Sequence, residues 1–154
     1  EHPHIDRGKG ERLVARWTHE EDWIVQRYVL YQHGITLAGA HVRTLLDPVS
    51  SDELKGAVSA ILREWWLPMV TDDHKLRKSG YQAYAVLSMC RIAYTLTHGD
   101  VVSKLAAAAW MLHREPSYAD LIQRALTWQL TANDIVTTQR LIALVGSNHK
   151  DVEL

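Results

Sequence analysis

Two basic side chains stand out because of the residues around them. Arg91 is the only formally charged residue between Ser79 and His98, a stretch of twenty residues. An arginine in such a neutral segment must extend to solvent, pair with a carboxylate from another element, or line a polar cleft. Lys104 directly follows Ser103, a residue type typical of helix N-caps. It is either a solvated lysine or part of a phosphate site, because a helix N-terminus beside a lysine attracts anions.

Other residue types that could do chemistry have simpler explanations. Cys90 lies in the same apolar stretch and is expected to be a core thiol rather than a nucleophile. Asp72, Asp73 and His74 are potential metal ligands, but three neighbours in one loop rarely point at one ion. The segment Gly8-Lys9-Gly10 lacks the glycine spacing of a phosphate loop. We therefore expect neither a metal site nor a catalytic residue in this chain.

The elements that position these residues are predicted to be helices. Apolar residues at helical spacing follow Ser50, which with Glu53 is predicted to form a capping box. The residues on this apolar face are Leu54, Val58, Ile61, Leu62 and Trp65. Further helices are predicted at residues 19–33, 79–98, 104–113, 118–131 and 133–145, with one helical turn near 42–46. Glu20, Glu21 and Asp22 suit the positive end of the first helix dipole.

Residues typical of helix ends complete the prediction of an all-α fold. Gly34, Gly99 and Gly146 are the expected helix terminators, and Ser117 with Asp120 resembles another capping box. We expect a helical bundle of about five to six helices over residues 19–146, followed by a tail at 147–154. Residues 1–18 are expected to be irregular or strand-like, with a candidate strand at Leu13–Trp17.

Composition narrows the class of protein. The chain has 154 residues, 47% hydrophobic and 23% charged, with a formal net charge of −1. These values suit one domain with its own core and exclude disorder or a polybasic arm for nucleic acid or a membrane. A single cysteine excludes a disulfide framework and suits the reducing cytoplasm. The six Trp and six Tyr, with no Phe, give every aromatic ring a polar tip, which suits a wet cleft wall.

One long block resembles a known family. The stretch from Tyr84 to Trp110, with Tyr94-Thr-Leu96, Gly99 and Ser103-Lys104 before an alanine run, is similar to the C-terminal helical domain of aminoglycoside adenylyltransferases. Upstream, Leu37-Ala-Gly39, Leu46-Asp-Pro-Val49 and Asp52-Glu-Leu54 resemble the linker and first helices of that domain. The resemblance covers roughly residues 20 to 126.

The resemblance implies the substrate-binding half of a nucleotidyltransferase. Family enzymes pair this domain with an N-terminal domain that holds magnesium on an Asp-x-Asp pair after a Gly-Ser turn and supplies a carboxylate base. This sequence has no Asp-x-Asp, and its only Gly-Ser is Gly146-Ser147. We therefore expect the catalytic domain to belong to a longer parent that uses ATP and magnesium. The isolated chain is expected to bind ligands poorly and to be inactive.

The same resemblance suggests roles for individual residues. Lys104 matches the lysine that reaches the phosphates of ATP across the interdomain cleft. The family's acidic residues that hold the aminoglycoside lie just before the central helix, where this sequence has Arg77, Tyr81 and Gln82. Tyr81 and Gln82 become substrate-binding candidates, with Asp73 as a substitute carboxylate. Asp72 and Glu64 are weaker substitutes. A polycation needs carboxylates, so this departure argues against a streptomycin-like substrate.

Two hypotheses about function therefore stand side by side. In the first, the chain contacts a nucleotidyltransferase domain and a small molecule with a hydroxyl group. In the second, it is a non-catalytic helical binding or dimerisation module that uses its apolar surface to form a homodimer or hold another protein.

Overall fold

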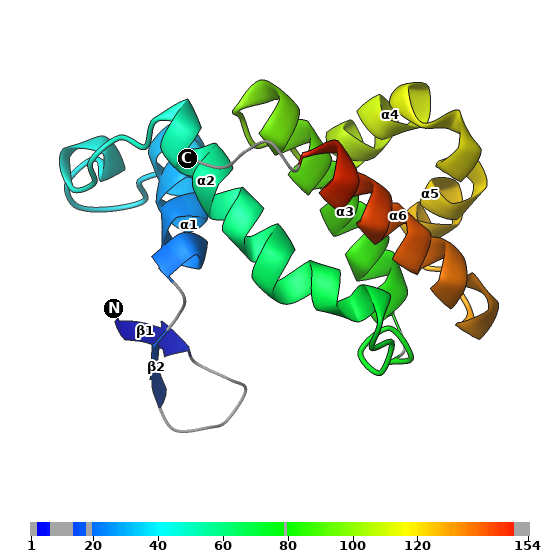
Figure 1. Cartoon of the computed structure of the whole chain (residues 1–154). Coiled ribbons are helices and arrows are strands. Elements are labelled where there is room, and N and C mark those ends of the chain that lie inside the picture. Colours follow the sequence, from blue (N-terminus) through cyan, green and yellow to red (C-terminus); the bar gives the residue numbers. More distant parts are fainter. Residues whose placement is uncertain (1–2, 7–13, 18–19, 79, 150–154) are drawn as a thin grey trace.

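The computed structural model describes residues 3–6, 14–17, 20–78 and 80–149. The described residues form six α-helices, which confirms the all-α prediction (Figure 1). The α-helices are α1 (Glu20–His33), α2 (Ser51–Ile61), α3 (Tyr81–His98), α4 (Lys104–Arg114), α5 (Ala119–Leu126) and α6 (Ile135–Asn148). Shorter helical turns are η1 (Val42–Thr44), η2 (Leu62–Trp66), η3 (Leu67–Val70), η4 (Pro116–Tyr118) and η5 (Ala132–Asp134).

A two-stranded hairpin precedes the helices. Strand β1 (Pro3–Asp6) pairs antiparallel with β2 (Val14–Trp17), and Pro3 lies opposite Trp17. The predicted strand therefore pairs with another strand of this chain. Its first residue, Leu13, and the Gly8-Lys9-Gly10 segment lie outside the described residues.

Helix α3 is the centre of the bundle. It contacts α2, α4, α5 and α6, and α1 lies on the far side of α2 (Figure 1). Its Cys90 is fully buried, and burial raises the pKa of the thiol to about 12, as expected for an inert core thiol. The helix ends at Gly99, which has a φ of 68°, as the sequence predicts. A Cβ at Gly99 would lie 1.7 Å from Ser51 Oγ, so glycine also permits the close approach of α2.

Two polar contacts hold α1 against the bundle. The Tyr28 hydroxyl donates to Asp100 Oδ1 at 2.8 Å, and burial together with this carboxylate raises the pKa of Tyr28 to about 12. Arg27 donates to the carboxylate of Glu53 in α2. The predicted capping box is therefore only half formed. Ser50 Oγ accepts from the Glu53 N–H at 3.1 Å, while the Glu53 side chain binds Arg27.

A π-helical turn changes which tryptophan is buried. Helical spacing predicts Trp65 on the apolar face with Leu62, but Trp66 is the buried residue, at 3% exposed, and Trp65 is 45% exposed. The turn η2 accommodates one more residue than an α-helical turn, so the register of the buried face moves by one position. The prediction for Trp65 was wrong for this reason, and its indole is left at the surface.

The last third of the chain departs from the predicted helix ends. The helix expected over 118–131 is shorter, because α5 ends at Leu126. Instead of capping with Ser117, Asp120 pairs with Arg124 at 2.8 Å. The capping box that forms is that of Thr131 and Asp134, ahead of α6.

Gly146 was predicted to end the last helix but lies inside α6, which continues to Asn148. A Cβ at Gly146 would lie 2.6 Å from Leu67 Cδ2. This glycine therefore permits close packing of α6 on η3 instead of terminating a helix. Across the described residues, none of the helices is both long and apolar enough to span a bilayer.

Candidate functional site

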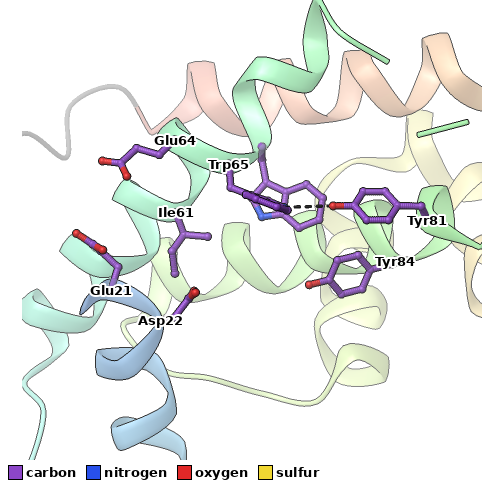
Figure 2. A pocket seen from close by; sticks show the side chains of 8 residues that line it. Glu21, Asp22, Ile61, Glu64, Trp65, Tyr81 and Tyr84 are labelled. Carbon is purple, nitrogen blue, oxygen red and sulfur yellow. Dashed lines mark hydrogen bonds between the residues drawn. The ribbon is translucent and has the colours of Figure 1, made fainter. Parts of the chain in front are cut away.

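A cleft of about 470 Å³ opens between α1, η2 and α3 (Figure 2). Its carboxylates are Glu21 and Asp22 from α1 and Glu64 from η2. The remaining lining residues are Ile61, Trp65, Trp66, Tyr81 and Tyr84. Figure 2 shows the tyrosines of α3 on one side, the carboxylates toward the other, and Trp65 between them. We call this hollow the acidic cleft.

The aromatic wall of the acidic cleft is held by contacts among its own rings. Trp65 Nε1 donates to Tyr81 Oη at 3.2 Å (Figure 2), and the Lys75 ammonium lies 3.4 Å from the centre of the Trp65 ring. The Tyr84 ring is 5.5 Å from both Trp66 and Tyr81. Burial raises the pKa of Tyr81, so this phenol stays protonated at neutral pH. Such electron-rich faces attract organic cations.

The carboxylates of the acidic cleft have no neutralising partners within the described part of the chain. There, Glu21, Asp22 and Glu64 take part in no ion pair, and no Lys, Arg or His lines the cleft. Three acidic side chains beside apolar walls concentrate a negative potential that draws in cations. The described residues contain no group of three or more His, Cys, Asp or Glu side chains placed to hold one metal ion.

Two cations, Arg91 and Lys104, lie near Tyr84 and are not among the residues that line the acidic cleft. Lys104 is the first residue of α4, whose cap is formed by Ser103 Oγ accepting from the Ala106 N–H at 3.1 Å. The Lys104 ammonium is 4.8 Å from the centre of the Tyr84 ring. Burial, and then the nearby Arg91 guanidinium, lower the pKa of Lys104. We call Arg91 and Lys104 the cationic pair.

Arg91 lies in surroundings that bear on its three explanations. In the described residues, no carboxylate pairs with it. It lines a hollow of about 180 Å³ that it shares with Tyr84, and another of about 520 Å³ that it shares with Ser103. Arg91 is therefore a cleft-lining cation, two helical turns along α3 from Tyr84.

Of the three substrate-binding candidates, only Tyr81 lines the acidic cleft. Gln82 is 6% exposed and lines a different pocket, since neighbouring residues of a helix point in different directions. Asp73 accepts two hydrogen bonds from Arg77, at 2.8 and 2.7 Å, and is not among the cleft residues. Asp72 pairs with His74 at 3.2 Å, so these loop carboxylates serve local contacts.

Sequence reasoning named Glu64 as a weaker substitute carboxylate but missed the two carboxylates that α1 contributes to this cleft. Glu21 and Asp22 were assigned to a helix dipole, although Asp22 shares a helix face with Val25 and Val29, three and seven residues on. That spacing would have placed Asp22 beside the packed face of α1. No local signal could have brought Glu64 to the same hollow, because its position depends on the π-helical turn and on the docking of α1.

Comparison with protein families matches residues 44–145 to a model described as aminoglycoside adenylyltransferase, C-terminal domain. The matched region begins at the last residue of η1, ends within α6, and includes Glu64, Tyr84, Arg91 and Lys104. The α1 carboxylates lie outside it. No curated protein matches the chain.

Proposed function

Since the chain belongs to the family of the aminoglycoside adenylyltransferase C-terminal domain, we propose that it binds the two substrates of a nucleotide transfer. The reaction joins a substrate hydroxyl oxygen to the α-phosphorus of ATP and breaks the bond to the pyrophosphate leaving group. The hydroxyl proton goes to a base. The chain's own part is to hold the donor and the acceptor side by side.

The position of Tyr84 carries this proposal. Its ring lines the acidic cleft and also lies 4.8 Å from the Lys104 ammonium. Tyr84 therefore borders both the acidic cleft and the cationic pair. A polyanion such as ATP is attracted to the cationic pair, and a polycation such as an aminoglycoside is attracted to the acidic cleft.

The cationic pair supplies the nucleotide side. Lys104 stands at the N-terminus of α4, where the helix dipole also favours anions, and Arg91 adds a second charge from α3. Two like charges near one another are costly without a ligand. The phosphates of ATP would relieve that repulsion, so both residues are assigned to phosphate binding.

The acidic cleft supplies the acceptor side. Arg77, Tyr81 and Gln82 stand where carboxylates are expected near the start of the central helix, which by itself disfavours a streptomycin-like substrate. Glu21, Asp22 and Glu64 reach the same hollow from other elements. Together with the faces of Trp65 and Tyr84, they support a substrate that carries guanidinium or ammonium groups beside its hydroxyl.

The described residues contain no group of three or more potential metal ligands, and we assign no step through the metal to them. We assign the metal ions and the base to a nucleotidyltransferase domain that packs against this one. This chain alone then binds both ligands weakly and transfers nothing. Adenylylation of an aminoglycoside by the isolated chain would contradict that division of labour.

Calorimetric titration with streptomycin tests the acceptor site. Combining Asp22→Asn with Glu64→Gln keeps the shape of the cleft and removes two charges, so we expect affinity to fall about tenfold. Asp47→Asn, a change at an exposed loop residue outside the cleft, is the matched control and should leave affinity unchanged. Equal affinity of the double variant and the control would overturn the assignment of the cleft.

The alternative, a binding or dimerisation module, is favoured by one observation. Ile35, Leu37 and Leu45, around η1, are 86%, 95% and 69% exposed. Exposed apolar groups of this kind are typical of contact surfaces. Light scattering over a hundredfold range of concentration distinguishes the hypotheses: a stable dimer abolished by Leu37→Ser supports the module. A monomer that binds ATP and streptomycin supports the transferase.

A further inference from the structure

A second pocket, of about 270 Å³, lies at the start of α3 and shares no residue with the acidic cleft. One side is formed by Arg77, Lys78, Gly80, Gln82 and Ala83, and the other by Trp128, Leu130, Thr131 and Ala132 from the connection between α5 and α6. We call this hollow the α3 pocket. Neither the family match nor the proposed function assigns it a role.

Gln82 is the unusual residue of the α3 pocket. It is 6% exposed, yet its Oε1 is buried without a hydrogen-bond partner, and no described residue bonds to its amide nitrogen. Buried polar groups are nearly always paired, because an unpaired one loses its hydration without compensation. A side-chain amide offers donors and an acceptor side by side. A ligand in the α3 pocket would satisfy both.

The backbone at this end of α3 also favours an anion. The helix begins after Gly80, whose φ is 73°, and no side chain caps it. The Tyr81 N–H donates to the Lys78 carbonyl oxygen at 3.0 Å. The next N–H groups, those of Gln82 and Ala83, have no partner within the helix and lie at the positive end of the dipole of an 18-residue helix. Lys78 adds a full charge at the same end.

The charges around the α3 pocket are otherwise balanced. Arg77 is neutralised by its two hydrogen bonds to Asp73. Asp134, which accepts from the Thr131 N–H at 2.8 Å, is bound by two nitrogens of Arg124. No Asp or Glu is among the described residues that line the pocket, so an anion would meet Lys78 without a competing carboxylate.

Trp128 lines the α3 pocket in an unusual backbone conformation. Among the described residues it is the one non-glycine with a positive φ, 58°, and its side chain is 60% exposed. A Cβ on Gly80 would lie 3.4 Å from the Trp128 ring, so the indole lies directly against the start of α3. The ring therefore forms part of the wall of the α3 pocket.

We propose that the α3 pocket binds a phosphate-type oxyanion that retains one P–OH group. Its oxygens accept from Lys78, from the backbone N–H groups of Gln82 and Ala83, and from Gln82 Nε2. Its P–OH donates to Gln82 Oε1, so that the amide and the ligand form two parallel hydrogen bonds. Hydrogen phosphate meets these requirements, whereas sulfate at neutral pH has no hydrogen to donate. This site is independent of the cationic pair.

Amide-resolved NMR titration of the whole chain with inorganic phosphate tests the proposal. We expect saturable shifts at Gly80, Gln82 and Ala83, and an affinity for phosphate several-fold above that for sulfate at equal ionic strength. A Lys104→Ala background removes phosphate binding at the cationic pair. In that background the phosphate-induced shifts of the α3 pocket should be unchanged. Loss of phosphate binding at the cationic pair and absence of phosphate binding in the α3 pocket are therefore separate results.

Two variants and a control complete the test. Gln82→Leu should weaken phosphate binding about tenfold or more, because it removes two hydrogen bonds to a charged ligand. Gln123→Leu, at an exposed position of α5, should leave it unchanged. Lys78→Ala, at an exposed position, should weaken phosphate binding a few-fold. Absent shifts, equal sulfate affinity, or unchanged binding in either Gln82→Leu or Lys78→Ala would overturn the proposal.

Discussion

The acidic cleft and the cationic pair meet at Tyr84 but are built in different ways. The cationic pair comes from a residue two turns along α3 and from the first residue of α4, positioned by the Ser103 cap. The acidic cleft needs three elements that are distant in sequence, α1, η2 and α3. One region depends mainly on local helix geometry, and the other on how separate helices dock.

The difference shows where this fold tolerates change. The cationic pair keeps its arrangement as long as α3 and α4 form. The acidic side depends on the Tyr28–Asp100 and Arg27–Glu53 contacts that dock α1, and on the π-helical turn that exposes Trp65. Acceptor binding should therefore be sensitive to substitutions that leave nucleotide binding intact.

The largest effect is expected where the π-helical turn separates two adjacent tryptophans. Trp66→Ala should lower the free energy of unfolding by about 3–5 kcal/mol, because it leaves a cavity in the core. Trp65→Ala should lower it by less than about 1 kcal/mol, since the ring is half exposed, and should weaken streptomycin binding instead. Urea denaturation measures the first quantity and calorimetry the second. Equal destabilisation by the two variants would refute the register shift.

Next in size is the loss of Lys104. Lys104→Ala should lower the affinity for ATP about tenfold, because it removes a charge-assisted contact to phosphate, and should leave streptomycin affinity unchanged. Calorimetry on the chain and the KM for ATP of an enzyme that contains a nucleotidyltransferase domain both measure this. Arg140→Ala, at an exposed position of α6, is the control. An unchanged KM would remove Lys104 from the phosphate site.

A smaller effect on both ligands is expected from the shared wall. Tyr84→Ala should weaken the binding of ATP and of streptomycin about three-fold each, because the ring borders both regions and the residue is 41% exposed. Tyr31→Ala removes a ring that contacts Arg43, outside both regions, and should change neither affinity. If Tyr84→Ala lowers the affinity for only one of the two ligands, the ring does not contribute to both binding regions.

The smallest effect concerns proton binding at Lys104. Burial and the Arg91 charge hold its pKa below the ordinary value of 10.5. Arg91→Gln removes the like charge, so the pKa of Lys104 should rise, while burial keeps it below 10.5. Affinity for ATP is lost as pH rises through the Lys104 pKa, and in Arg91→Gln this loss should move to higher pH. NMR titration of the lysine side chain measures the shift, and a lowered pKa would contradict the proximity of the two cations.

Much of the fold was predictable because its signals are local. Gly99 ends α3 in a left-handed conformation, and Ser103 caps α4 with its own hydroxyl, as the sequence indicates. The burial of Cys90 follows from the apolar stretch around it. Each of these depends on a residue and its neighbours within one helical turn. The position of Lys104 at a helix start was predictable on the same grounds.

The acidic cleft was not predictable, because each of its parts depends on another element. The π-helical turn exchanges Trp65 for Trp66 in the core, which helical periodicity alone does not anticipate. Gly146 has the residue type of a helix terminator but serves the packing of Leu67. In both cases tertiary packing outweighs a local preference worth about 1 kcal/mol.

By itself, the sequence determined the helical class, the ends of the central helix, the place of Lys104 and the family resemblance. These follow from backbone geometry and periodic burial, which act over a few residues. Only the tertiary structure decided that Glu21, Asp22 and Glu64 share one cleft, that Arg91 is without a carboxylate partner in the described residues, and that Tyr81 and Gln82 serve different pockets. The physical reason is that docking between helices sets which side chains meet, and docking energy is spread over the whole core.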